Sequence, residues 1–287
     1  MSRESKRLGL LLLLPMIVFS FIFGMYPLIF SIFLSFTPRV FGPPEYWFAG
    51  PANYFTAVAD DFFRNSLSVT FIIGFGAVCL ELLLGLALAL LLNEKLRGAR
   101  FARIALLLPM MTPPIVVGII WKTMLLPTTG PFAFVFRSFG MDWPNILGTP
   151  MSILAVILTD VWQNTPFVML ILLAGLQNIP PPIVEAADLD GARSYARFRH
   201  VTLPLLFPVM LVAIIFRLVS ALKIFDTVYV LTQGGPSFAS EVISIFVQRT
   251  FVFQYEIAYA SAASIIFMIM TFALAIAMIR VMRWSQR

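Results

Sequence analysis

The sequence has little of the chemistry that metal sites and many catalytic centres need. It contains one cysteine, Cys79, and one histidine, His200, among 287 residues. A lone cysteine excludes an intrachain disulfide and a metal site built from cysteines, and a lone histidine excludes a histidine pair. No GxxxxGK[ST] phosphate-binding loop occurs in the chain, so it does not bind ATP through such a loop. We therefore expect no catalytic residues, no metal site and no cofactor bound by this chain.

Charged residues are also scarce, and the fraction of apolar residues is correspondingly high. Charged residues make up 12% of the chain and hydrophobic residues 60%, and the mean hydropathy is +0.93. Soluble domains are roughly half apolar and about a quarter charged, whereas runs of about 20 apolar residues are typical of membrane-spanning helices. The composition predicts an all-α polytopic membrane protein with one transmembrane domain over residues 1–287. Six spans are expected, at 9–36, 65–92, 104–126, 151–176, 203–231 and 258–281.

The first apolar run begins with basic residues and contains Pro15 and Pro27. A secretory signal peptide would share the basic start, but no small-residue cleavage pattern follows the apolar stretch. An uncleaved first span is therefore expected.

The basic residues predict the orientation. Most of the 20 Lys and Arg residues lie at the termini and in the loops after the second and fourth spans: Arg3, Lys6, Arg7, Lys95, Arg97, Arg100, Arg103, Arg193, Arg197, Arg199, Arg280, Arg283 and Arg287. By the positive-inside rule, both termini and the 177–202 loop are cytoplasmic. The net charge of +6 is thus a topology signal, and we expect the lipid bilayer as a partner and no nucleic acid.

A polar hairpin separates the fourth and fifth spans. The segment NIPPP ends the fourth span, because proline interrupts the helical hydrogen-bond ladder. Residues 183–189 then predict a short helix, and Gly191 permits a sharp change of direction. Two interpretations are open on these grounds: an ordinary amphipathic connector, or a compact helix that docks on a protein at the cytoplasmic surface.

The residues of this hairpin also carry a resemblance. Glu185, Ala186, Ala187, Asp190, Gly191 and Ala192, followed by LPLL at 203–206, resemble the EAA loop of binding-protein-dependent ABC importer permeases. Further segments resemble the carbohydrate branch of this family, which includes maltose-, lactose- and glycerol-3-phosphate-type inner-membrane subunits: NEKLRGARFARIALLLP (93–109), DVWQNTPFVMLILLAGLQNIP (160–180) and KIFDTVYVLTQGGP (223–236). The resemblance covers nearly the whole chain.

The resemblance implies a type I ABC importer transmembrane domain in the cytoplasmic (inner) membrane of a prokaryote. It implies a second, different permease subunit, two cytoplasmic ABC ATPase subunits that bind ATP and Mg, and an extracytoplasmic solute-binding protein. Residues 185–187 and 190–192 would form the coupling helix, and the outer loop Thr232–Pro236 would meet the binding protein. The chain itself would be a non-catalytic subunit.

Six ionisable residues fall within the expected spans: Glu81, Lys122, Asp160, Arg217, Lys223 and Asp226. Such residues are costly in lipid and must face protein, water or the interface. Glu81 shares a helical face with Gly74 and Gly85, which favours a structural polar contact at a close helix crossing over a functional role. Lys122 lies near the outer end of its span, where it can snorkel.

The fourth span places Asp160, Gln163, Asn164 and Phe167 on one face. This mixture of carboxylate, amide and aromatic groups suits sugar hydroxyls and the sugar's apolar face. The resemblance implies a transmembrane sugar site at these four positions together with Arg217, Ala221 and Asp226. Two interpretations are open for Asp160 and Arg217: an ion pair between helices or direct contact with the solute, and the two are compatible if the solute competes for the pair. The spacing of three also predicts that Lys223 and Asp226 can pair.

The function predicted from these features is import of a sugar or polyol. A glycerol-3-phosphate or other small-solute ABC importer subunit is the alternative, because Arg217 and Lys223 could serve a phosphate. A secondary transporter would use similar intramembrane charges, but it would not need the hairpin and is expected to show repeat symmetry.

Overall fold

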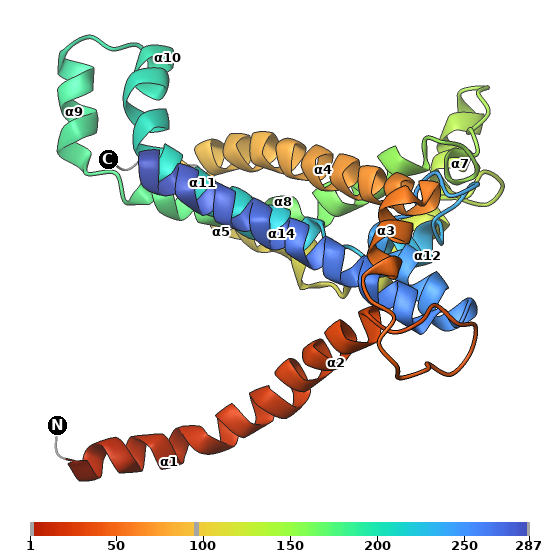
Figure 1. The fold of residues 1–287 in the computed structure, drawn as a ribbon. Helices are drawn as coiled ribbons and strands as arrows, with labels where there is room; N and C mark the ends of the chain where they lie inside the picture. Colours follow the sequence, from red (N-terminus) through yellow and green to blue (C-terminus); the bar gives the residue numbers. More distant parts are fainter. Residues whose placement is uncertain (1–2, 95–97, 286–287) are drawn as a thin grey trace. The chain divides into compact units, whose positions relative to one another are not determined.

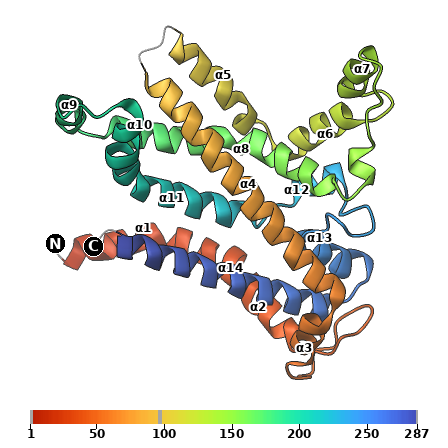
Figure 2. The same ribbon diagram turned by 90° about the horizontal axis from the view of Figure 1, so that it is seen from above.

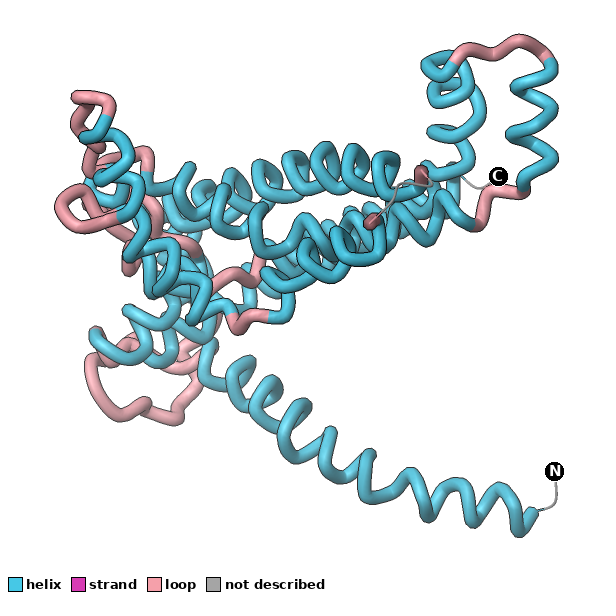
Figure 3. Tube along the Cα trace, turned by 180° about the vertical axis from the view of Figure 1, so that it is seen from behind, coloured by secondary structure: helices cyan, strands magenta, loops and turns pink. Residues whose placement is uncertain are grey.

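The computed structural model describes the backbone of residues 3–94 and 98–285 and the side chains of residues 12–94 and 98–283. Within these residues every regular element is a helix (Figure 3). Helices long and apolar enough to cross a membrane cover Leu12–Ser35, Asp61–Asn93, Ser152–Gln177, Ser194–Ala221 and Ile257–Arg283. A bent pair, Ala99–Met111 with Pro114–Leu125, makes a sixth if it counts as one span. The all-α membrane class is confirmed. Arg3, Lys6, Arg7, Lys95, Arg97 and Arg287, which support the predicted orientation, lie outside the described side chains.

The chain forms two compact units. One comprises Met1–Arg64 and Phe246–Ile269, and the other comprises Asn65–Ile245 and Met270–Arg287. Two long helices, α4 (Asp61–Asn93) and α14 (Ile257–Ser285), contribute to both.

The first unit starts with one long helical run, made of α1 (Arg3–Ser20), the π-helical turn η1 (Phe21–Met25) and α2 (Tyr26–Ser35). Pro27 has no N–H to donate, and the chain absorbs this with the π turn, in which the Tyr26 N–H bonds the Phe21 carbonyl. The run is continuous in spite of both prolines. Its side chains from Leu12 onward are largely exposed, as expected for a helix that faces lipid.

Polar contacts hold the rest of this unit together around α3 (Ala52–Ala59), η4 (Arg249–Phe253) and the first turns of α14. The buried Glu256 carboxylate accepts a hydrogen bond from Arg39 Nε at 2.8 Å and forms an ion pair with Arg39 Nη2 at 2.6 Å. The Arg39 guanidinium also lies 4.1 Å from the centre of the Tyr259 ring. The Tyr259 hydroxyl donates to Asp60 at 2.6 Å, and Asp60 caps the start of α4 by accepting from the Phe62 N–H.

The second unit is built around α8 (Ser152–Gln177). This helix is buried on most sides, so its apolar residues are not confined to one stripe. Its residues belong to two apolar clusters. One cluster includes Ile73 and Val228, and the other includes Ala89 and Leu206. Glycines allow the close crossings: a Cβ on Gly85 would lie 2.8 Å from Val168 Cγ1, and one on Gly175 would lie 2.7 Å from Leu206 Cδ1.

The expected third span, 104–126, is not one straight helix. It consists of α5 (Ala99–Met111) and α6 (Pro114–Leu125), which meet at a bend of 97° (Figure 2). Pro113 and Pro114 both lack an N–H, so the helical ladder cannot continue through them.

The predicted fifth span, 203–231, is wrong at both ends. Helical structure begins at α10 (Ser194–Arg197), continues through η3 (Phe198–Thr202) and ends with α11 (Leu203–Ala221). The chain then breaks, and α12 (Asp226–Leu231) is a separate short helix packed on α6. Gly118 makes that packing close, because a Cβ there would lie 2.9 Å from Val230 Cβ. The remaining helices are α7 (Pro131–Ser138), η2 (Ile146–Gly148), α9 (Pro181–Leu189) and α13 (Ile243–Gln248).

Candidate functional site

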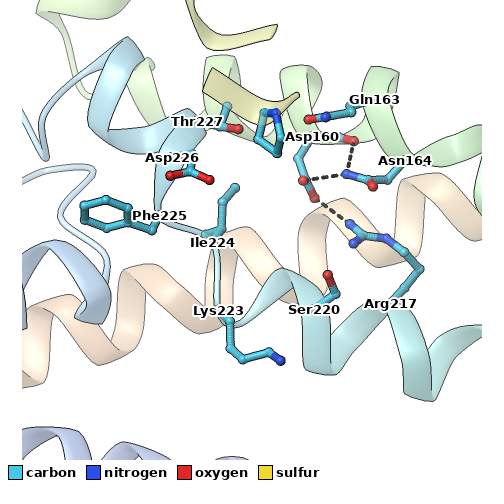
Figure 4. A pocket seen from close by; sticks show the side chains of 11 residues that line it. Asp160, Gln163, Asn164, Arg217, Ser220, Lys223, Ile224, Phe225, Asp226 and Thr227 are labelled. Carbon is cyan, nitrogen blue, oxygen red and sulfur yellow. Dashed lines mark hydrogen bonds and ion pairs between the residues drawn. The ribbon is translucent and has the colours of Figure 1, made fainter. Parts of the chain in front are cut away.

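A polar cavity lies in the second unit, between α8, α11, the break after α11 and the start of α12 (Figure 4). Its volume is about 180 Å³. The residues that line it are Pro114, Asp160, Gln163, Asn164, Arg217, Ser220, Lys223, Ile224, Phe225, Asp226 and Thr227. Asp160, Gln163, Asn164, Arg217 and Asp226 of the expected sugar site are therefore brought together at one cavity, and Lys223 lines it too.

Asp160 and Arg217 line this cavity, and together with Glu81 behind them they form a group of three buried charges. Arg217 Nε donates to Glu81 Oε2 at 2.6 Å, and Arg217 Nη2 donates to Glu81 Oε1 at 2.6 Å. Nη2 also donates to Asp160 Oδ2 at 2.7 Å. The expected Asp160–Arg217 pair is thus present, and the polar contact expected of Glu81 is its bidentate pair with Arg217. Such pairs must be well bonded, because removing one partner leaves a buried charge uncompensated.

The three charges come from three helices, α4, α8 and α11. A Cβ on Gly74 would lie 3.0 Å from Leu222 Cδ2, which shows how closely α4 and α11 approach. Gly85 gives α4 the same close approach to α8. The glycine face predicted around Glu81 is therefore the reason that its carboxylate reaches Arg217.

The two amides of α8 have different partners. Asn164 Nδ2 donates to Asp160 Oδ1 at 2.9 Å, so it holds the carboxylate from the side opposite Arg217. Gln163 Nε2 donates to the Thr112 carbonyl at 2.9 Å. Thr112 is the last residue before the prolines of the α5–α6 bend, where the helical ladder stops. Gln163 therefore links the cavity wall to that bend.

The predicted Lys223–Asp226 pair is wrong. The spacing of three predicts contact only within one helix, but Lys223 lies in the break after α11, and Asp226 is the first residue of α12. In Figure 4 their side chains point in different directions. Lys223 is exposed, and Asp226 is half-buried at the start of α12.

Phe167 does not line the cavity. It packs against the apolar cluster around Leu172 and Leu206, so the aromatic face predicted for a sugar is not provided by this residue. Ala221 is buried in the protein interior. Ser220 lies on the cavity instead, three residues after Arg217 and hence on the same helical face, a signal that could have identified it.

Lys122 also has a specific partner. Its Nζ donates to the Val230 carbonyl near the end of α12 at 2.9 Å. A lysine at this position satisfies a carbonyl at the end of a short helix and complements its dipole. The residue thus helps to hold α12 on α6.

The polar hairpin stands at the end of α8 and α11 (Figure 1). Its helix α9 has no buried residues, and Leu189 is 89% exposed. Gly191 ends it with φ +75°, and the Ala192 N–H bonds the Ala187 carbonyl while the Gly191 N–H bonds the Asp188 carbonyl. This is the Schellman arrangement of a helix end that glycine favours. The predicted short helix and the turn at Gly191 are confirmed.

Asp188 ties the two arms of the hairpin together. Its Oδ1 accepts a hydrogen bond from Arg197 Nη1 at 2.8 Å. An exposed pair of this kind contributes little stability on its own. It does restrain α9 relative to α10, so Glu185 and its neighbours are presented on a defined surface.

Apolar membrane helices, a polar cavity between them and an exposed capped hairpin define a membrane permease. A family model described as "Binding-protein-dependent transport system inner membrane component" matches residues 81–287. The chain belongs to this family and is a permease subunit of such a transport system.

Individual proteins agree with this assignment. The chain is 41% identical over 244 residues to the trehalose/maltose transport system permease protein MalF of Thermococcus litoralis. The aligned region covers 85% of this chain and 82% of the relative. In fold the chain is similar to a subunit of a bacterial ABC transporter involved in import of the acidic polysaccharide alginate. The TM-score is 0.87 and the sequence identity 22%, and the match covers 99% of this chain and 98% of that subunit. A bacterial alginate transporter in complex with an alginate pentasaccharide-bound periplasmic protein has a TM-score of 0.84, 22% identity, and coverage of 96% and 93%.

Proposed function

We propose that the protein moves a neutral sugar or polyol across the cytoplasmic (inner) membrane of a prokaryote, driven by ATP hydrolysis on partner subunits. The observation that carries the proposal is the position of α9. This helix joins α8 to the α10–α11 arm, and α8 and α11 are the helices that supply Asp160 and Arg217 to the cavity. A movement of α9 therefore acts directly on the two walls of the cavity.

The chemistry of the cavity supports a hydroxyl-bearing solute. Asp160 offers carboxylate oxygens that can accept hydrogen bonds, and Arg217, Asn164 and Ser220 offer donors. Carboxylate and guanidinium side by side can bond neighbouring hydroxyl groups of one solute. The relatedness to a trehalose/maltose permease favours the same class.

The partners follow from the family. We propose that an extracytoplasmic binding protein delivers the solute to the outer loops, among them Thr232–Pro236. Two ATPase subunits would hold the exposed α9 of this chain and the corresponding helix of a second, different permease subunit. In this arrangement ATP and Mg bind the ATPases, and Glu185, Ala186, Ala187, Asp190, Gly191 and Ala192 transmit the movement. Both termini of this chain are then cytoplasmic.

Uptake by the reconstituted complex tests the proposal. Proteoliposomes that contain the complex and the binding protein would be supplied with ATP inside and with labelled trehalose, maltose, glycerol or glycerol-3-phosphate outside. ATP-dependent accumulation of a neutral sugar or polyol is expected. Accumulation of glycerol-3-phosphate alone would replace the proposed substrate class with the anionic one.

A further inference from the structure

Glu81 sets the orientation of the Arg217 side chain in the cavity wall. Its two carboxylate oxygens accept bonds from Nε and Nη2 of the guanidinium, each at 2.6 Å, and Nη2 also bonds Asp160. Nη1 takes part in none of these three bonds. Arg217 lines the cavity, and Nη1 is the terminal nitrogen left outside these bonds, which makes it the candidate donor to a solute beside the Asp160 carboxylate. Glu81 itself is fully buried and does not line the cavity.

Glu81 also decides the charge of the site. Both of its oxygens accept bonds from one guanidinium, which is the fork-shaped geometry of an ionised carboxylate with arginine. The charged groups of the cavity and its wall are Glu81, Asp160 and Asp226 on the acidic side, and Arg217 and Lys223 on the basic side. The site therefore carries one negative charge more than it has positive charges. Without the charge of Glu81, the numbers of negative and positive groups would be equal.

We propose that Glu81 is a positioning residue that determines solute specificity. It holds Arg217 next to Asp160 as a donor–acceptor pair for neighbouring hydroxyl groups, and its charge makes the site reject anionic solutes. Rejection follows because an anionic solute in this cavity meets an excess of carboxylate, and unfavourable charge contacts are an efficient means of discrimination. The inference rests on the proposed function, since it takes the cavity to be the place where the solute binds.

The test compares a neutral disaccharide with the same disaccharide carrying an anionic phosphate group. Equilibrium binding of labelled trehalose and trehalose-6-phosphate would be measured on the whole transporter complex in lipid nanodiscs, without the binding protein, so that the selectivity of that protein does not enter. Wild type is expected to prefer trehalose. Glu81→Gln should reduce this preference about tenfold, which corresponds to about 1.4 kcal/mol. Glu81→Asp keeps the charge but cannot reach both nitrogens, so it should weaken trehalose binding and keep the preference.

A matched control comes from the first unit. Glu256 is also buried and pairs with an arginine, Arg39, at 2.6 Å, but it does not line the cavity. Glu256→Gln should leave both the affinity for trehalose and the preference unchanged. A purely structural role of Glu81 would lower the yield or thermal stability of the complex without changing the preference.

The outcomes separate the inference from the proposed function. An unchanged preference in Glu81→Gln, with trehalose still bound, would overturn the inference and leave the proposed function standing. If the Glu81→Gln complex does not assemble, Glu81→Asp provides the test instead. This variant keeps the negative charge, so loss of its preference for trehalose over trehalose-6-phosphate would also overturn the inference. If wild type binds neither trehalose nor maltose, the proposed substrate class fails and the inference fails with it.

Discussion

At the scale of single residues, three buried charges and their bonds hold α4, α8 and α11 together beside the cavity. An Asp160–Arg217 pair could be predicted, because both residues lie at similar depth in neighbouring spans and neither is tolerable alone in lipid. The contact with Glu81 could not be predicted, because the glycine face around it indicates a close crossing without saying which helix crosses. The Lys223–Asp226 prediction failed because the spacing rule assumes a continuous helix, and the chain breaks between them.

Asp160→Asn tests the role of the carboxylate in transport. The amide keeps the size of the side chain but loses the charge-assisted bond with Arg217 and offers a solute one acceptor instead of two. We expect solute uptake to fall by about tenfold or more, the loss typical of one charge-assisted bond, while the protein remains in the membrane at its normal level. The exposed Asp142→Asn serves as the control. Normal uptake by Asp160→Asn would rule out the proposed role.

Arg217→Ala tests the stability of the charge group. Glu81 and Asp160 would remain buried with no cation between them, and breaking a buried pair costs about 3–5 kcal/mol. A large fall in the unfolding temperature in detergent is expected. Arg64→Ala removes an exposed partner of Asp61, and since such pairs contribute about 0–1 kcal/mol, it should hardly change that temperature. Equal effects of the two substitutions would contradict the account.

At the scale of elements, the coupling hairpin was predictable and the two helix breaks were only partly so. NIPPP and Gly191 mark the limits of α9 by their backbone restrictions, and the structure has the helix and turn where those residues predict them. The tandem prolines at 113–114 signal the α5–α6 bend, although the apolar run continues through them. The break after Ala221 has no such signal, because Leu222, Lys223, Ile224 and Phe225 include neither proline nor glycine.

Gly191→Ala tests the helix end directly. A Cβ there would meet no atom within 4 Å, so the cost comes only from φ +75°, at about 1 kcal/mol or somewhat more. The end of α9 should fray, and the affinity of the ATPase for the permease in nanodiscs should fall by up to about tenfold. Gly191→Asn should lose less ATPase affinity than Gly191→Ala, because asparagine tolerates this backbone conformation.

Gly140 provides the matched control for this substitution. It ends α7 with φ +72°, open space around a Cβ and the same pair of capping bonds, from Gly140 to Arg137 and from Met141 to Phe136. Gly140→Ala should carry the same local strain and leave ATPase affinity unchanged. A similar loss in both variants would show that strain alone, and not the position of the coupling hairpin, causes the effect.

At the scale of the whole molecule, the sequence predicts membrane class and orientation from different kinds of information. The class follows from hydropathy and is confirmed by the apolar helices. The orientation follows from the distribution of Lys and Arg, a property of insertion that helix geometry alone does not contain. It therefore stays a prediction that needs its own measurement.

Cysteine labelling tests the orientation. Cys79 is the sole cysteine, so Cys79→Ser gives a background without thiols. Leu189→Cys and Phe41→Cys would then add one thiol at positions that are 89% and 80% exposed. A membrane-impermeant maleimide applied from outside should label the Phe41→Cys variant and not the Leu189→Cys variant. The reverse pattern would place α9 on the outer side, where no ATPase could reach it.

The most direct test of the central claim is ligand-stimulated ATP hydrolysis in nanodiscs by a complex purified on a tag carried by this chain. We expect an ATPase to co-purify with the chain and hydrolysis to rise when the binding protein and its sugar are added. We also expect this rise to be lost when Glu185 is changed to alanine. A chain that purifies without any ATPase, or hydrolysis that does not depend on Glu185, would contradict the claim that α9 couples ATP to the cavity.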